Sequence, residues 1–313
     1  MRRFQNILYV SGATLDESYA LKQALSLARA QGTELHVLVL CPRLPPNLRE
    51  YETGYEESLV DRLAASITGT EEALKMGPEE VRTRVEVGCG DTQAVNIVRR
   101  VIRDAYDLVI KQPEPSDSRR PGFRAMDMEL LRLCPCPVWL CRPIQRPRTD
   151  IRVAVAIDPT GEEPSGQDLA LQLLRLSRML ADTGNGELNV VSCWEYEFED
   201  LLRHSPWIRK PEEAIVEEVG AAERNHRAAL EALIRDSGVA GRIRINHVRG
   251  RPERAIPGFV HDMEIDILVM GTVARTGIPG FIIGNTAENI VGELRCSLVA
   301  LKPNGFVSPV HAY

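Results

Sequence analysis

A glycine-marked loop holds the residues of this chain whose types and spacing best suit chemistry. The sequence GTVARTGIPGFIIGNT (271–286) follows the apolar run 267–270 and precedes a helix-like stretch, AENIVGELRC. Backbone N–H groups at the start of a helix lack partners within it and carry partial positive charge, so they bind phosphate oxygens well. Glycines let such a ligand approach the backbone closely. The loop therefore predicts a phosphate site around Gly284, Asn285 and Thr286.

The same residues also fit a structural role. Asn285 and Glu288 have the spacing of a capping box, in which Asn285 would cap the helix and Glu288 would reach back. Such a cap stabilises a helix by about 1 kcal/mol without any ligand. Both roles stay open, since different N–H groups can serve each.

Asp158 follows another apolar run, in the sequence Ile157-Asp158-Pro159-Thr160. A carboxylate at the end of a strand can accept hydrogen bonds from a ribose hydroxyl or an adenine amino group. An Asx turn or a helix cap explains the same aspartate equally well.

The seven cysteines and six histidines predict no metal site. No two cysteines form a Cys-x-x-Cys pair, and most lie in or beside apolar runs, where cysteine behaves as a small hydrophobe. Cys134 and Cys136 form one close pair without a histidine cluster nearby, and the histidines lack metal-ligand spacing. No general base accompanies a magnesium-binding carboxylate at the glycine loop. We therefore expect no protein-held metal and no catalytic residue.

These residues belong to a chain that repeats itself. Strand, helix and strand patterns occur at 6–40 and again at 152–193, each followed by a long charged helical stretch and an alternating strand. The segments LLRLCPCPVWLCRP (130–143) and IVGELRCSLVALKP (290–303) align without a gap at an offset of 160 residues. The two halves are therefore predicted to be internal duplicates.

Alternating strands and helices predict the fold class. Strand–helix–strand units form parallel sheets through right-handed crossovers, so we expect two tandem, doubly wound α/β domains of the flavodoxin-like or Rossmann-like kind. The predicted boundaries are 1–145 and 151–313, with a linker at 146–150. Such sheets bind ligands outside the carboxyl ends of their strands, where the strand order reverses. Asp158 and the glycine loop follow strands at that edge.

Composition narrows the function. A chain of 313 residues suggests two domains, at about 150 residues for each. The net charge of -6 argues against direct nucleic-acid binding, and the absence of a run of about 18 apolar residues argues against a membrane span. The N-terminus lacks a signal-peptide pattern, which predicts a cytoplasmic location.

The second half resembles a universal stress protein domain. Nucleotide-binding members of that family carry Gly-x2-Gly-x9-Gly-Ser/Thr between the fourth strand and the last helix. The matching frame here is Gly271-x2-Ala274-x9-Gly284-Asn285. With the duplication, the chain is similar to tandem members of the family, and GTVARTG, GNTAEN and the tail 301–310 look most like the bacterial E-type subgroup.

The resemblance implies an ATP-like adenine nucleotide in the second half, with Mg²⁺ present only as its companion. Asp158 would meet the adenosine and the Cys193 backbone would flank the base. The residues implied at the phosphates are Gly271, Ala274, Gly284, Asn285 and Thr286.

Two residues depart from the motif. Ala274 replaces its second glycine, and a left-handed conformation there would cost roughly 1–2 kcal/mol. Asn285 replaces the hydroxyl residue but keeps an amide that can form hydrogen bonds.

The first half departs further, so we expect no phosphate loop in it. The offset of 160 places Lys111 opposite Gly271 and Arg124 opposite Gly284, while Gly12 stands in the place of Asp158.

By resemblance, the chain is a stress-response binding module rather than an enzyme. Its halves would pair through their last strands, VWLCRP against LVALKP, into a pseudo-dimer, and the protein would form a homo-oligomer. Slow ATP hydrolysis or phosphotransfer remains an alternative. A carrier of apolar ligands without nucleotide is another, suited to the hydrophobic loop residues Ile278, Phe281, Ile282 and Ile283.

Overall fold

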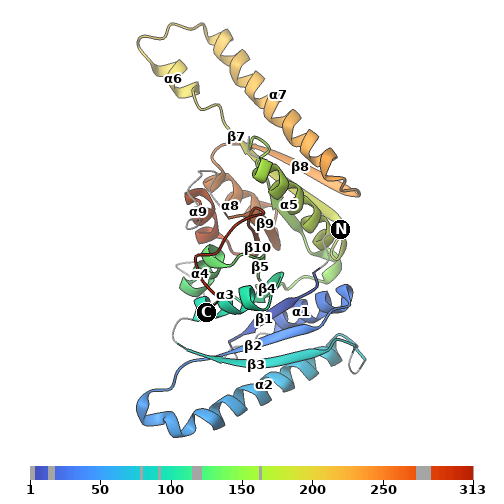
Figure 1. Ribbon diagram of the computed structural model, residues 1–313. Helices are drawn as coiled ribbons and strands as arrows, with labels where there is room; N and C mark the ends of the chain where they lie inside the picture. The colour runs from blue at the N-terminus through green and yellow to red at the C-terminus, as the bar shows by residue number, and fades with distance from the viewer. Residues whose placement is uncertain are drawn as a thin grey trace.

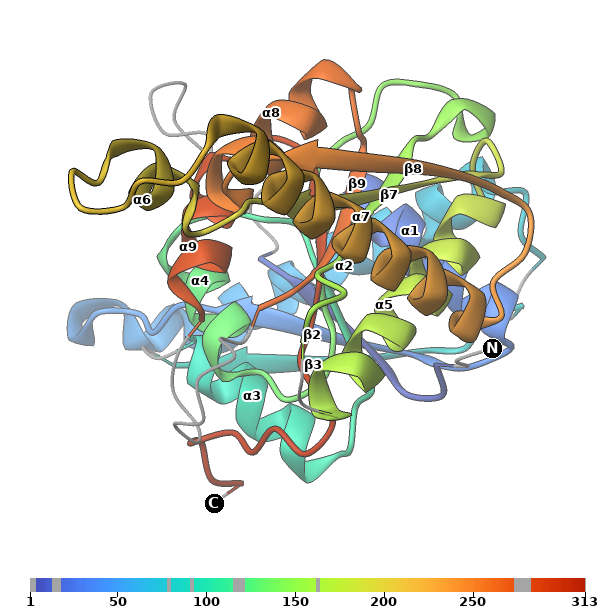
Figure 2. The same ribbon diagram turned by 90° about the horizontal axis from the view of Figure 1, so that it is seen from above.

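The described strands form one continuous sheet of ten strands, covered by helices (Figure 1). Long helices run beside the two outermost strands, at opposite ends of the molecule (Figures 1 and 2). The computed structural model describes residues 4–12, 18–77, 80–90, 93–114, 122–161, 164–272 and 283–312.

Each half of the chain contributes five of these strands. The first half contains β1 (Ile7–Ser11), α1 (Ser18–Gln31), β2 (Leu35–Cys41), η1 (Pro46–Tyr51), α2 (Glu52–Ala73), β3 (Thr83–Cys89), α3 (Gln93–Arg103), β4 (Leu108–Lys111), α4 (Ala125–Leu133) and β5 (Val138–Leu140). The second half contains η2 (Arg148–Asp150), β6 (Val153–Ala156), α5 (Pro164–Asp182), β7 (Glu187–Trp194), α6 (Glu199–His204), α7 (Glu212–Ser237), β8 (Arg242–Arg249), α8 (Pro252–Asp262), β9 (Ile267–Gly271), α9 (Asn285–Glu293) and β10 (Ser297–Leu301).

The strand order is β3-β2-β1-β4-β5-β10-β9-β6-β7-β8, so each half has the same doubly wound arrangement. Every pairing is parallel except that of β5 with β10, where Trp139 lies opposite Val299. The predicted antiparallel pairing of the two last strands is thus what joins the halves. In each half the order reverses between the first and fourth strands, at β1 and β4 and at β6 and β9.

Hydrophobic periodicity accounts for the layers. Leu21, Ala24, Leu25 and Ala28 recur at helical spacing on α1, and all four are buried. The alternating strand of each half is β3 or β8, and these two strands form the edges of the sheet and contain no fully buried residue. Each edge strand has one face exposed to solvent, which explains why polar and apolar residues alternate along it while the central strands are continuously apolar.

Side chains and backbone also join the halves beside the sheet. Lys302 donates from Nζ to the carbonyl oxygens of Leu131 and Cys134, both at 2.7 Å, where α4 ends. A cation there satisfies carbonyls that have no partner in the helix. Gly122 lies so close to α9 that an ideal Cβ on it would be 2.2 Å from the carbonyl oxygen of Gly292.

Candidate functional site

Asp158 and Gly271 flank the point where the strand order reverses in the second half. Val155 pairs with Val269, so Asp158 and Thr272, each three residues later, follow the ends of adjacent strands. The Asp158 side chain is exposed, and its Oδ1 accepts hydrogen bonds from the Thr160 N–H (2.9 Å) and the Thr160 hydroxyl (2.6 Å). These bonds form the predicted Asx turn, which fixes the carboxylate at the open edge of the sheet.

Gly271 is a glycine for a reason of packing. Its backbone is not left-handed, and an ideal Cβ would lie 2.9 Å from Cδ2 of Leu169 on α5. A helix thus approaches this strand end closely.

Hydrogen bonds close the base of the glycine loop. The Thr272 N–H donates to the Leu301 carbonyl (3.1 Å), and the Gly284 N–H donates to the Thr272 carbonyl (3.1 Å). The end of β9 and the start of α9 are therefore held together. Ala274 lies outside the described residues, as do Ile278, Phe281 and Ile282.

The predicted capping box is wrong. Gly284, not Asn285, is the N-cap of α9, and no described side chain caps this helix. Glu288 instead forms an ion pair with Arg132 on α4. An arginine from the other half offers the carboxylate a charged partner, which replaces the bond back to the helix start. Asn285 and Thr286 are exposed in the first turn of α9.

Cys193 comes from the strand next to β6, near the same edge. It is half-buried, and burial together with the charge of Glu253 raises the pKa of its thiol to about 11. Ile283 is buried in the apolar core.

Strand register corrects the expected match of the halves at β4. Val109 pairs with Val138, whereas Leu268 pairs with Leu298, so the offset here is 159 rather than 160. Lys111 therefore corresponds to Met270, and the loop to the next helix is one residue shorter in the first half. The offset of 160 holds where the helices begin, because Arg124 is the N-cap of α4 as Gly284 is of α9.

A buried ion pair occupies the base of the first-half loop. Lys111 Nζ lies 2.9 Å from Asp127 Oδ1 and also donates to the Gln112 carbonyl (2.8 Å). Both charged side chains are almost fully buried, at 5% and 0% exposure. The corresponding residues of the second half are Met270 and Ala287, both in the apolar core.

A carboxylate also occupies the start of α4. Glu114 Oε2 accepts the Met126 N–H (3.2 Å), while the Glu114 N–H donates to Asp127 Oδ2 (2.9 Å). Met126 is in the first turn of α4, so the negative charge lies where a helix start favours an anion. The first half thus supplies its own anion at this place.

Sequence comparison identifies the family. The family model described as Universal stress protein family matches residues 3–142 and 152–302. This chain belongs to the universal stress protein family. It is similar to universal stress protein E of Escherichia coli strain K12, with 28% identity over 99% of this chain and 98% of the relative. The Salmonella typhi protein of that name is 27% identical over the same shares.

Solved structures of universal stress proteins share the fold. One from Pseudomonas aeruginosa UCBPP-PA14 has a TM-score of 0.71 at 23% identity, covering 97% of this chain and 95% of that one. One from Archaeoglobus fulgidus DSM 4304 has a TM-score of 0.63 at 14% identity, covering 95% and 98%. The predicted tandem α/β class is thereby confirmed over nearly the whole chain.

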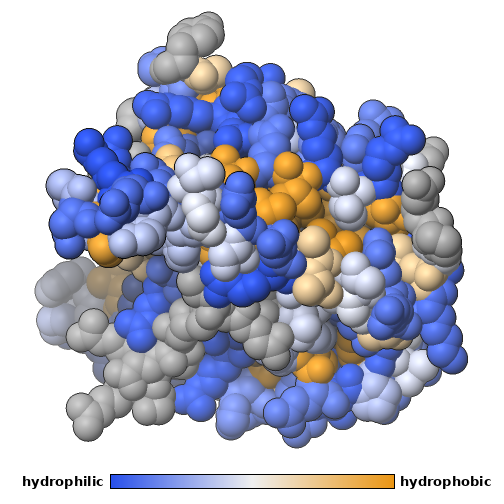
Figure 3. Space-filling view, turned by 90° about the horizontal axis from the view of Figure 1, so that it is seen from below, coloured by the Kyte–Doolittle hydropathy of each residue, from blue (hydrophilic) through white to orange (hydrophobic). Residues whose placement is uncertain are grey.

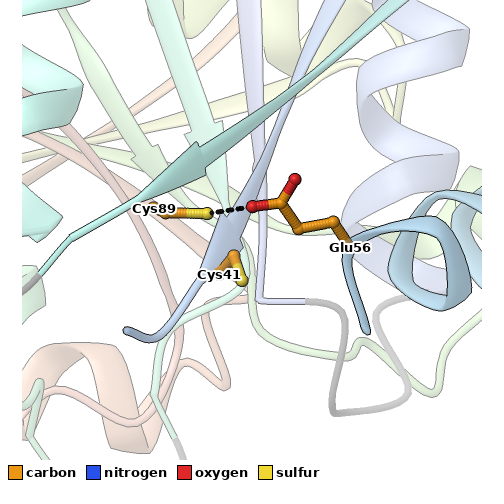
Figure 4. Close-up of side chains that lie close together, drawn as sticks. All are labelled: Cys41, Glu56 and Cys89. Atoms are coloured by element: carbon orange, nitrogen blue, oxygen red, sulfur yellow. Dashed lines mark hydrogen bonds between the residues drawn. The ribbon is translucent and has the colours of Figure 1, made fainter. Parts of the chain in front are cut away.

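This universal stress protein also contains a thiol cluster that sequence reasoning missed. The ligand atoms of Cys41, Glu56 and Cys89 all lie within 4.8 Å of one another (Figure 4). The Cys89 thiol donates to Glu56 Oε1 at 2.9 Å, and partial desolvation of its sulfur together with this carboxylate raises the pKa of the exposed thiol well above its usual range. Both cysteines end adjacent parallel strands, and that sequence signal could have placed them together.

Two histidines that lack metal-ligand spacing in the sequence lie together in the second half. His226 Nδ1 and His247 Nε2 are 2.9 Å apart, and the His247 ring stacks on Trp194. Burial lowers the pKa of both, and for His247 the charges of His226 and Arg227 lower it further, opposed by Glu223 and Glu231. The pair is therefore a neutral structural contact between α7 and β8.

We expect this histidine pair to make stability fall in acid. A histidine with a lowered folded-state pKa stays neutral while the unfolded chain takes up protons, so its contribution is present above the ordinary pKa of 6.5 and lost as pH falls through the folded-state value. Urea unfolding measured from about pH 7 to about pH 5 should show a shallower loss for His226→Gln than for the wild type. Equal pH dependence in the two proteins would contradict this assignment.

The face in Figure 3 is mostly hydrophilic, with hydrophobic residues in a broken band across its middle. Among the described residues, no helix combines the length and apolar character needed to cross a membrane.

Proposed function

We propose that the second half of this universal stress protein binds an adenine nucleotide such as ATP, with its phosphates at the start of α9. The supporting residues come from adjacent strand ends at the reversal point and from the first turn of the next helix. They are Asp158, Gly271, Gly284, Asn285 and Thr286; the family resemblance adds Cys193 on β7 and Ala274, which lies outside the described residues.

The comparison of the two halves carries this proposal. At the start of α4, the Glu114 carboxylate accepts the N–H of Met126. At the start of α9, the equivalent donor is the N–H of Thr286, and no described side chain caps the helix. The same helix start thus has an internal anion in one half and none among the described residues of the other. An external anion such as a phosphate suits the second position.

The other contacts are assigned by position. The fixed Asp158 carboxylate is suited to accept hydrogen bonds from the nucleoside, and the Cys193 backbone to flank the base. Mg²⁺ would arrive with the phosphates and neutralise part of their charge. The proposed role is binding rather than catalysis. Glu288 is the acidic residue closest in sequence to the phosphate site, and its ion pair with Arg132 makes it a poor general base. By the same proposal, the protein acts in the cytoplasm as a homo-oligomer during stress.

Calorimetric titration with ATP and Mg²⁺ tests the site. Gly284 has φ -58° and ψ 141°, which valine can adopt, so Gly284→Val should fold yet obstruct the phosphates. We expect it to lower ATP affinity at least about tenfold, or 1.4 kcal/mol. Gly258→Val is the matched control, since a Cβ on Gly258 meets no atom within 4 Å.

Two outcomes would contradict the proposal. One is a wild-type protein without measurable affinity for ATP. The other is an unchanged affinity in Gly284→Val, which would place the nucleotide elsewhere. Mass spectrometry of the denatured, freshly purified protein adds an independent result, because a co-purified lipid-like molecule in place of a nucleotide would favour the carrier alternative.

A further inference from the structure

The thiol cluster of Cys41, Glu56 and Cys89 lies at the outer strands of the first half, away from the reversal point of either half. Cys41 is the last residue of β2 and Cys89 the last residue of β3, and the two face each other in the strand register. Glu56 comes from the first turns of α2 and points its carboxylate at Cys89 (Figure 4). Three separate elements therefore bring their donor atoms to one place.

We propose that Cys41, Glu56 and Cys89 bind a thiophilic divalent cation, namely Zn²⁺, in the first half. Two thiolates and one carboxylate form a ligand set that suits zinc, and three protein ligands leave the fourth tetrahedral position to a water molecule. Cys89 is exposed, which gives the ion and that water access from solvent. Binding releases the two thiol protons to solvent, so the bound site is a dithiolate.

The distances fit such a site after a small adjustment. Bond lengths of about 2.3 Å to sulfur and about 2.1 Å to oxygen place tetrahedral donors about 3.6–3.8 Å apart. The Cys89 sulfur and Glu56 Oε1 are now 2.9 Å apart because a thiol hydrogen bond joins them, and all the donor atoms lie within 4.8 Å. Replacing the proton by a metal ion requires this pair to separate by less than an ångström, which side-chain rotation can supply.

The second half shows that the fold does not itself require these residues. The last register pair of β7 and β8 is Trp194 with Arg249, at the place of Cys41 with Cys89. The Arg249 guanidinium lies 5.5 Å from the centre of the Trp194 ring and pairs with Glu199. At these strand ends the second half therefore has an arginine packed on an aromatic ring, whereas the first half has two thiols.

The cluster is also distinctive within the chain. Among the residues that the structure describes, no other set of three His, Cys, Asp or Glu side chains brings its donor atoms this close. Cys134 and Cys136 also hold their sulfur atoms close together, 3.6 Å apart, but among the described residues no third metal-ligating side chain joins them. The zinc site shares no residue with the nucleotide site, so each proposal stands or fails alone.

Metal titration of the full-length, reduced protein tests the proposal. We expect one equivalent of Zn²⁺ to be retained against a chromophoric chelator, and Co²⁺ in its place to give sulfur-to-cobalt charge-transfer absorption. Loss of a direct ligand in Cys89→Ser should weaken Zn²⁺ binding about 100-fold or more, and Glu56→Gln should weaken it about tenfold or more. Cys136→Ser is the matched control and should bind as the wild type does.

The outcomes separate cleanly. Cys89→Ser changes an exposed residue, so its thermal unfolding without metal should match that of the wild type and exclude misfolding as the cause. Zinc retained equally by Cys89→Ser, zinc lost only in Cys136→Ser, or the absence of cobalt–thiolate absorption would each overturn the site. A wild type that releases its zinc to the weakest competing chelator would overturn it as well.

Discussion

Lys111→Met should destabilise the first half by about 3–5 kcal/mol, because it leaves the fully buried Asp127 carboxylate without its cation. Such a loss is a large part of the stability of an ordinary domain. Urea unfolding followed by circular dichroism would measure it as a lower midpoint. A loss below about 1 kcal/mol would show that the ion pair contributes little.

The second half supplies the control for this prediction. Its equivalent residues, Met270 and Ala287, form part of the apolar core without any buried charge. The double variant Lys111→Met, Asp127→Ala therefore reproduces an arrangement that this fold already accepts. We expect the double variant to be more stable than Lys111→Met alone, since replacing both charges removes the unpaired one. A double variant less stable than the single variant would contradict this explanation.

Gly122→Ala should weaken the contact between the halves by about 1–3 kcal/mol. The added methyl group would meet the backbone of Gly292, with its carbonyl oxygen 2.2 Å away, and a helix backbone cannot rotate aside as a side chain can. The same segment is fixed by Arg142, whose guanidinium donates to the Gly122 carbonyl and lies over the Phe123 ring. Denaturant unfolding would show a lower midpoint, with the two halves separating first.

Gly292→Ala is the matched control, because it adds the same methyl group on the other side of the contact. An ideal Cβ on Gly292 meets no atom within 4 Å, and alanine favours a helix over glycine by about 1 kcal/mol. We therefore expect this variant to be as stable as the wild type or more so. Similar losses in both variants would show that the close approach is not the cause.

Periodicity and internal repetition predicted most of the fold. The apolar stripe of α1 and the half-exposed edge strands follow from patterns that persist over many residues. The antiparallel β5–β10 pairing was expected from the family resemblance instead, and the structure shows it. Local patterns were less reliable where a distant residue competes. The capping box failed because Arg132, which lies 156 positions away in sequence, pairs with Glu288.

Two features could be located only from the pairing of strands in the sheet, namely the residue that corresponds to Lys111 and the meeting of Cys41 with Cys89. A constant offset fitted the last helix and strand, but the shorter loop after β4 shifted the match by one residue and moved Lys111 from Gly271 to Met270. The cysteines were judged by their separation along the chain, whereas Cys41 and Cys89 meet because parallel strands end at one edge. The sequence signal for this cluster is that each cysteine lies at the end of a strand and that the two strands are neighbours in the sheet.

The β5–β10 junction lies within one chain, so dilution cannot separate its two sides. A short linker holds tethered partners at an effective concentration on the order of millimolar. In a symmetric assembly of separate chains every substitution occurs twice, whereas here Lys111 and Glu114 occur once. One half can therefore lose a ligand site while the other evolves independently, and the number of ligands carried by each molecule is set by sequence divergence rather than by symmetry.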